Sequence, residues 1–261
     1  MKNKRLRTIG KAIAVAAAFL FLTGAFLFQF HKTRHAAVLE YHCVEEEPFS
    51  AAEELFVRPA DLEDQIRVLQ EAGYRFVFAS EAKPLCFRKT VCLTFDDGYK
   101  DNLTQLLPIL ERMDAKATVF VCTDLLGFNE NFLTREELQQ LAESPCIEIG
   151  SHGCSHRDLL GLSMEETELE LRESKAELEE LTGKEVSVFS YPGGHYSWEQ
   201  AQLAGSIYRS CFTAAGGTYY LGLRNHKNVL PRIPVRRGET GTDVLKKLEE
   251  ARPGWDVYSG Y

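Results

Sequence analysis

The chain has 261 residues, of which 44% are hydrophobic and 26% are charged, as is ordinary for a folded domain with a full core. Its formal net charge of −8 argues against a general nucleic-acid-binding role. The seven cysteines are odd in number and never form a Cys-x-x-Cys pair, so they indicate neither a zinc knuckle nor a disulfide framework.

The first 35 residues are interpreted as a targeting segment. Residues 12–30 are apolar and uncharged, and they follow five cationic side chains: Lys2, Lys4, Arg5, Arg7 and Lys11. The stretch is near the length of one membrane span and exceeds the usual signal-peptide core of about 7 to 15 residues. Since positive charge precedes it, we expect a single-pass signal anchor in the cell membrane, with residues 36–261 outside the cytoplasm. Because no clear cleavage site follows, a cleaved signal peptide and a secreted protein are the second choice.

From residue 36 onward, strand-like and helix-like patterns alternate within one domain. The expected strands cover residues 38–42, 74–78, 91–95, 117–122, 147–150, 186–190, 211–214 and 229–235. The expected helices cover residues 59–72, 102–113, a segment capped by Thr134 and Glu137, a glutamate-rich segment from Ser163 to about Gly183, and 242–251. The glutamate-rich face should be solvated. This alternation predicts a parallel sheet with helices outside it, in an irregular α/β barrel.

Two adjacent carboxylates, Asp96 and Asp97, follow the strand at residues 91–95 and precede Gly98. At the end of a buried strand they would repel each other unless a cation or a proton lay between them. The pair is therefore interpreted as one metal ligand and one base. Taken alone, the Asp-Asp-Gly pattern fits a simple turn equally well.

A second polar motif follows the strand at residues 147–150 and contains His152 and His156. Their spacing allows both imidazoles to reach one ion at about 2.0 to 2.1 Å. With one aspartate they would form a ligand set that leaves positions open for water and substrate; two surface histidines are the alternative. We expect Cys154, between them, to fill space because its side chain would point away from both. In a barrel, reactive groups gather at the carboxyl ends of the strands, and Arg232 also lies near such an end.

Together these motifs resemble the first two motifs of the polysaccharide deacetylases, carbohydrate esterase family 4, with the NodB homology domain. The matching stretches are Thr-Phe-Asp-Asp-Gly at residues 94–98 and Ser-His-Gly-Cys-Ser-His at 151–156. Residues 39–42, 189–194 and 230–235 favour the subgroup that acts on poly-N-acetylglucosamine. The resemblance implies a distorted (β/α) barrel over residues 36–261 and hydrolytic deacetylation of an N-acetylglucosamine polymer at the cell surface.

The resemblance also implies roles for the four polar residues. Asp96 would be the general base, and Asp97, His152 and His156 would hold one divalent metal ion, with zinc favoured over cobalt or nickel. Such an ion lowers the pKa of bound water and polarises the acetyl carbonyl. The protein must then remove one proton and hold the developing oxyanion.

Further residues are expected near the site. The family pattern implies a second oxyanion donor at a backbone N–H near Tyr191, and His42 should line the pocket. Tyr99, Tyr191, Tyr196 and Trp198 could stack on sugar faces or pack at the barrel rim.

The chain departs from the family pattern in three places. Ser190 stands where an arginine often orients the base, residues 210–213 lack an aspartate and tryptophan motif, and residues 229–235 lack the histidine that commonly acts as general acid. His195, His226 or a metal-bound water are the candidates for that acid. The departures leave two alternatives open: a catalytically impaired glycan-binding module, and a deacetylase of peptidoglycan or another acylated glycan.

Overall fold

The computed structural model of the chain describes residues 11, 13–25, 36–83, 89–214, 219–220 and 226–253. Residues 13–25 are helical. Among the residues described, no helix has both the length and the apolar character needed to cross a membrane. The predicted membrane anchor at residues 12–30 is therefore not confirmed, and part of it, residues 12 and 26–30, lies outside the described chain.

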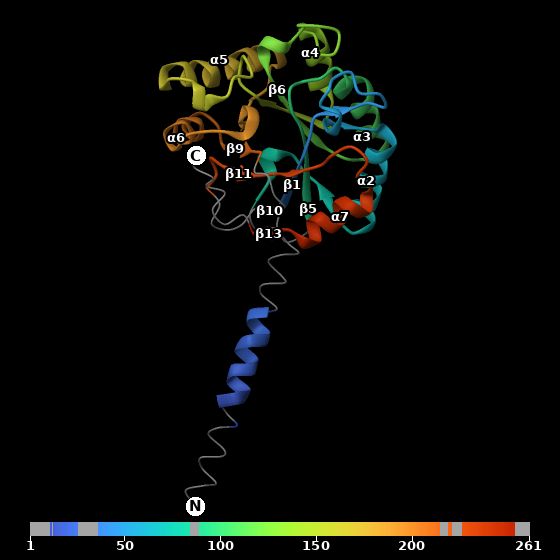
Figure 1. Ribbon diagram of the computed structural model, residues 1–261, viewed down its shortest axis with the longest axis vertical. Helices are drawn as coiled ribbons and strands as arrows, with labels where there is room; N and C mark the ends of the chain where they lie inside the picture. The colour runs from blue at the N-terminus through green and yellow to red at the C-terminus, as the bar shows by residue number, and fades with distance from the viewer. Residues whose placement is uncertain are drawn as a thin grey trace, which may run out of the picture.

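A nine-stranded sheet forms the centre of the fold (Figure 1). Its main path runs in the spatial order β11 (Leu230–Pro231), β9 (Ser210–Thr213), β8 (Val188–Ser190), β7 (Ile147–Ser151), β6 (Ala117–Val121), β5 (Thr90–Phe95), β1 (Ala36–Tyr41) and β12 (Ile233–Pro234). The ninth strand, β4 (Arg75–Phe76), pairs with the start of β5. All of these pairings are parallel, as the sequence predicted.

The two ends of this path are consecutive in the chain. β11 pairs with β9, β12 pairs with β1, and Arg232 alone separates β11 from β12. The sheet therefore curves into a nearly closed barrel, and the predicted distorted (β/α) barrel is confirmed. Smaller strand pairs lie outside the main sheet: β2 (Cys43–Val44) with β3 (Phe56–Val57), and β10 (Tyr219–Tyr220) with β13 (Arg252–Pro253).

One buried cluster fills the inside of the barrel with residues from successive strands: Val38, Cys92, Phe120, Val188 and Phe212. Their neighbours Leu39 and Leu93 belong to the larger cluster that faces the helices. This division follows because successive side chains of a strand point to opposite faces. Gly150 leaves room for the interior, since a Cβ there would lie 2.5 Å from the Phe120 ring.

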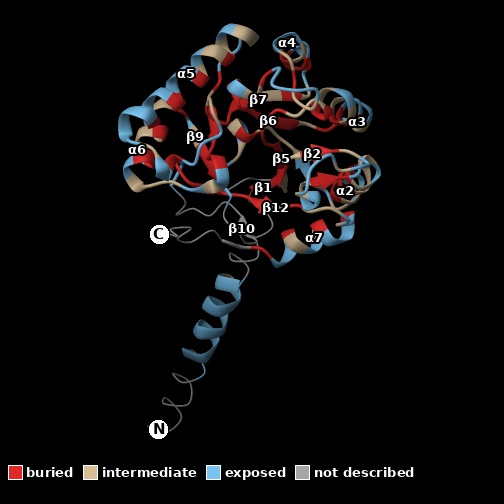
Figure 2. Ribbon diagram, turned by 45° about the horizontal axis from the view of Figure 1, so that its top comes forward, coloured by how far each residue is buried: buried red, intermediate tan, exposed pale blue. Residues whose placement is uncertain are grey.

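Helices surround the sheet, with their buried residues turned toward it (Figures 1 and 2). They are α2 (Pro59–Glu71), α3 (Leu107–Met113), α4 (Arg135–Glu143), α5 (Met164–Thr182), α6 (Trp198–Ile207) and α7 (Gly241–Glu250). A π-helical segment, η3 (Asn102–Leu106), leads into α3, and 3-10 turns are η1 (Glu53–Leu55), η2 (Ala79–Glu81), η4 (Thr123–Leu125), η5 (Leu159–Gly161) and η6 (Pro192–Gly194).

Local sequence signals account for most helix boundaries. The predicted capping boxes form at Thr134 with Glu137 and at Ser163 with Glu166, where side chain and backbone satisfy each other's free donors. α6 was not predicted; it begins after a third capping box, made by Ser197 and Gln200.

Candidate active site and metal centre

The predicted metal ligands lie together at one edge of the barrel. Asp97 and His152 follow β5 and β7, which are parallel strands on either side of β6, so both residues emerge at the same edge. A turn that contains Gly153 (φ 79°) and His156 (φ 57°) brings His156 to the same place. One ligand atom from each of Asp97, His152 and His156 lies within 4.8 Å of the other two.

The distances within this cluster fit a shared ion. Asp97 Oδ1 lies 3.4 Å from His152 Nε2 and 3.1 Å from His156 Nε2. In a tetrahedral zinc site with bonds of about 2.0 to 2.1 Å, neighbouring ligand atoms are about 3.3 Å apart. Asp97 Oδ1 is also buried and makes no hydrogen bond of normal geometry, which leaves its lone pairs directed into the cluster.

His152 is fixed in the tautomer that a metal ligand needs. Its Nδ1 lies 2.8 Å from the carbonyl oxygen of Ser190, which can only accept a hydrogen bond. Nδ1 of the neutral ring therefore carries the proton, and the Nε2 lone pair faces Asp97. Ser190, which stands where the family often has an arginine, thus orients a predicted metal ligand through its main chain.

The electrostatics of the cluster favour a cation. Burial alone would raise the pKa of Asp97, but the His152 and His156 side chains beside it hold it well below the usual value. Close contact with the Asp97 carboxylate raises the pKa of His156. The side chain of His156 is 42% exposed, so solvent can reach this side of the cluster. The residues present therefore fit a divalent ion.

Asp96, the predicted base, is held by an arginine from the closing strands. Arg232 Nη1 and Nη2 each donate to Asp96 across 2.7 Å, one to each carboxylate oxygen. Burial would raise the pKa of Asp96, but the charges of Arg232 and His152 lower it. Asp96 Oδ2 also lies 3.9 Å from His152 Nε2, beside the metal cluster. The carboxylate is therefore ionised, aligned and adjacent to the candidate ion.

Arg232 itself is 1% exposed and is surrounded by compensating groups. Glu40 Oε2 lies 3.5 Å from its Nη2, and Thr94 Oγ1 accepts from its Nη1 at 3.2 Å. The guanidinium also lies 5.7 Å from the centre of the Phe120 ring. The sequence placed Arg232 near a strand end but did not connect it with Asp96.

The two hydrogen-bond donors of Tyr191 itself are engaged elsewhere in the structure. Its backbone N–H donates to the carbonyl of Phe212 (3.0 Å), and its hydroxyl donates to the carbonyl of Asn228 (2.8 Å). Neither donor of Tyr191 is thus free for an oxyanion. Its ring is buried against Phe189 and Tyr196, in the core.

His42, by contrast, lies next to both aspartates, at the end of β1. Its charge lowers the pKa of Asp96 and of Asp97. Its Nδ1 is buried and has no hydrogen-bond partner. The two histidines that the sequence offered as the acid have different surroundings: His195 pairs with Asp158 at 2.7 Å on the surface, and exposed His226 packs edge-on against Trp198.

Most of the remaining predicted residues pack against other parts of the protein and are not ligands of the cluster. Cys154 Sγ donates to the carbonyl of Glu170 at 3.6 Å and is outside the ligand cluster, as predicted. Trp198 and Tyr196 pack against the core rather than forming a free platform. Tyr99 stacks on Phe132 with ring centres 4.8 Å apart, and burial and Asp97 raise its pKa, so Tyr99 lies near the metal cluster.

The family model "Polysaccharide deacetylase" matches residues 87–207, which include both motifs. YxkH of Bacillus subtilis (strain 168), assigned to the polysaccharide deacetylases, is 30% identical over 173 residues, which are 64% of this chain and 60% of YxkH. The poly-beta-1,6-N-acetyl-D-glucosamine N-deacetylase of Escherichia coli (strain K12) is 33% identical over 137 residues, which are 44% of this chain and 20% of that protein.

A solved structure extends the similarity to most of the barrel. The Streptococcus pyogenes deacetylase PplD, in complex with acetate, matches with a TM-score of 0.74 and 25% identity, over 82% of this chain and 98% of that chain. The chain spans less than two thirds of the length of the two curated relatives described above.

Proposed function

We propose that this chain, a member of the polysaccharide deacetylase family, hydrolyses the N-acetyl groups of a poly-N-acetylglucosamine chain with the help of one divalent metal ion. The products would be acetate and a free amine on the sugar. The observation that best supports this proposal is that Asp97 Oδ1 lies 3.4 Å from His152 Nε2 and 3.1 Å from His156 Nε2. Asp96, held by Arg232, lies beside this cluster. Zinc is the ion we propose, because an imidazole and carboxylate set with open positions is typical of catalytic zinc.

In this proposal each side chain has one task. A divalent ion, when bound, supplies Lewis acidity toward water and the acetyl carbonyl. Asp96 accepts the proton of the attacking water, and Arg232 keeps that carboxylate ionised and aligned. His42 donates a proton to the leaving nitrogen, since it is the described histidine beside both aspartates that the ligand set does not use. This assigns the acid that the sequence left open.

The substrate is proposed from the relatives. The Escherichia coli relative is named for poly-beta-1,6-N-acetyl-D-glucosamine, which supports the same polymer here. Peptidoglycan or another acylated glycan is the alternative. We also propose that the basic residues and apolar stretch within residues 1–35 anchor the barrel at the cell membrane, with secretion after cleavage as the alternative.

The direct test is release of acetate from purified substrates. The assay uses three substrates: oligomers of β-1,6-linked N-acetylglucosamine, chitin oligomers and peptidoglycan. Each is incubated with untreated enzyme, with chelator-treated enzyme and with the treated enzyme after zinc is restored. The proposal is supported if acetate is released faster from the β-1,6 oligomers than from the other two substrates, and if the chelator abolishes this release and zinc restores it. Release only from peptidoglycan would identify peptidoglycan as the substrate instead. Binding of all three without acetate release would indicate a glycan-binding module. His152→Ala should lose both metal and turnover.

A further inference from the structure

We propose that Glu170, on α5, is a positioning residue for the metal centre and acts through His156. This inference rests on the proposed function only in that the cluster of Asp97, His152 and His156 binds an ion. Glu170 is 6% exposed and belongs to none of the sequence motifs. It contacts the turn that joins the two histidines.

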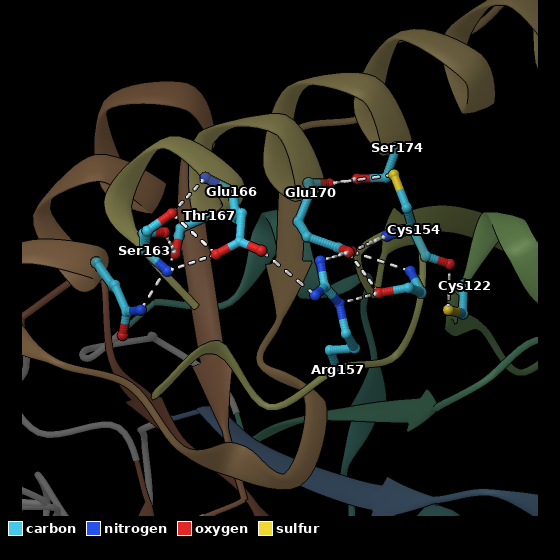
Figure 3. A network of polar contacts seen from close by, with 10 residues as sticks. Cys122, Cys154, Arg157, Ser163, Glu166, Thr167, Glu170 and Ser174 are labelled. Carbon is cyan, nitrogen blue, oxygen red and sulfur yellow. Dashed lines mark hydrogen bonds and ion pairs between the residues drawn. The ribbon is translucent and has the colours of Figure 1, made fainter. Parts of the chain in front are cut away.

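Glu170 accepts hydrogen bonds from consecutive residues of that turn (Figure 3). The backbone N–H groups of Cys154 and Ser155 donate to its Oε2 at 2.7 and 2.9 Å, and the Ser155 hydroxyl donates to its Oε1. Consecutive N–H groups that converge on one point form an anion-binding turn. Here the anion is a carboxylate of the protein itself.

The surroundings show that this site for a carboxylate is built into the fold. A buried charge is costly unless it is hydrogen-bonded and paired, and Arg157 adds an ion pair at 3.6 Å to Oε1. Gly153 allows the close approach, because a Cβ there would lie 3.2 Å from Glu170 Oε2. Glu173, on the same helix, is exposed and offers a comparison.

The opposite side of the turn is held by separate groups. The carbonyl of Gly153 accepts from the N–H of Thr123 at 3.2 Å, and the carbonyl of Cys154 accepts from the N–H of Asp124 at 2.9 Å. These contacts fix the carbonyl groups of the turn, and Glu170 fixes its N–H groups. The residue that follows is His156.

His156 has φ 57°, in the left-handed region, which is unfavourable for a residue with a side chain. Such a conformation persists only where the surrounding structure imposes it. In this conformation His156 Nε2 lies 3.1 Å from Asp97 Oδ1. Without Glu170, the N–H groups of residues 154 and 155 would lose their acceptor, and His156 could relax away from the ligand cluster.

The test measures zinc binding to the purified full chain, without substrate, by competition with a chromophoric chelator. Glu170→Ala should raise the zinc dissociation constant about 10- to 100-fold, the usual effect of removing a residue that orients a ligand. Glu170→Gln should raise it less, because its carbonyl oxygen still accepts both N–H groups. Glu173→Ala removes an exposed charge from the same helix and should leave zinc affinity unchanged.

A double-mutant cycle separates positioning from general destabilisation. If Glu170 acts through His156, Glu170→Gln should weaken zinc binding in the wild type but not in the His156→Ala background. Equal losses in both backgrounds would overturn the inference. So would unchanged zinc affinity in Glu170→Ala together with a lower melting temperature of the metal-free protein. Should Glu170→Ala fail to fold, Glu170→Gln decides; a wild type that binds no zinc would instead overturn the proposed function, and this inference with it.

Discussion

Asp96 and the turn at residues 152–156 are neighbours in the site, but the molecule holds them in different ways. Asp96 is fixed by charge, through two hydrogen bonds from a buried guanidinium on the segment that closes the barrel. The turn is fixed by hydrogen bonds between neutral main-chain groups and one carboxylate, and it contains a left-handed histidine. The proposed base should therefore depend mainly on its ion pair with Arg232, whereas the proposed ligand His156 should depend on several weaker contacts.

The strongest test of this comparison is Asp96→Asn. Turnover should fall about 10²- to 10⁴-fold, the contribution expected of a general base, while zinc content stays the same because Asp96 is outside the ligand set. Acetate release and elemental analysis measure the two quantities. Asp97→Asn is the matched control and should lose zinc. Loss of zinc from Asp96→Asn would instead make Asp96 a ligand, and unchanged turnover would remove its role as base.

Arg232→Lys tests the ion pair on the base side. Lysine keeps one charge but cannot make the paired hydrogen bonds, so turnover should fall roughly 10- to 100-fold, as for other residues that orient a catalytic group. Because Arg232 lowers the pKa of Asp96, the acidic limb of kcat/KM should move to higher pH in the variant. Arg209→Lys, on the surface, should change neither quantity. If the acidic limb of kcat/KM does not move, Arg232 does not set the pKa of the catalytic base.

Tyr191→Phe tests whether the Tyr191 hydroxyl acts only in the core. The change removes one buried hydrogen bond to the carbonyl of Asn228, which should cost about 1 kcal/mol of unfolding free energy. Turnover should be unchanged, because the hydroxyl points into the core. Urea denaturation and acetate release measure the two effects. A collapse of turnover in a stable variant would return Tyr191 to the active site.

The smallest expected effect is the pH dependence of stability that His156 causes. His156 has a raised pKa in the folded, metal-free protein, so its contribution to stability is full below the unfolded pKa, about 6.5, and is lost as pH rises through the folded value. Zinc competes with that proton, so zinc affinity should rise over the same window. The half-exposed ring keeps the stability change small. Melting temperatures of metal-free wild type and His156→Ala across this range test it; equal slopes would contradict it.

Most of the fold was predictable because its signals are local. Strand patterns, capping boxes and the alternation of strands with helices each involve residues close in sequence, and the two polar motifs directly follow buried strands. α6 is the exception: its signal is also local, a capping box of Ser197 and Gln200, but Trp198, expected as a sugar-binding or rim side chain, is the first residue of this helix. The membrane anchor remains a proposal.

The missed parts of the site depend on contacts between distant residues. Arg232 and Asp96 are 136 positions apart, so no local pattern connects them. Glu170 was expected on a solvated face, like the other glutamates of its helix. A usable signal did exist, because Glu170 lies on the same stripe as Thr167, Leu171 and Ser174, all of which are buried in α5.

The closure of the barrel at β11 and β12 has a consequence for folding during translation. Asp96 leaves the exit tunnel long before Arg232, and β1 has no neighbour on one side until β12 is made. A nascent chain that stops short of residue 232 would carry Asp96, the proposed base, without its guanidinium partner and would leave an open edge beside β1. The segment Leu230–Pro234 therefore both completes the main sheet and brings Arg232 to Asp96.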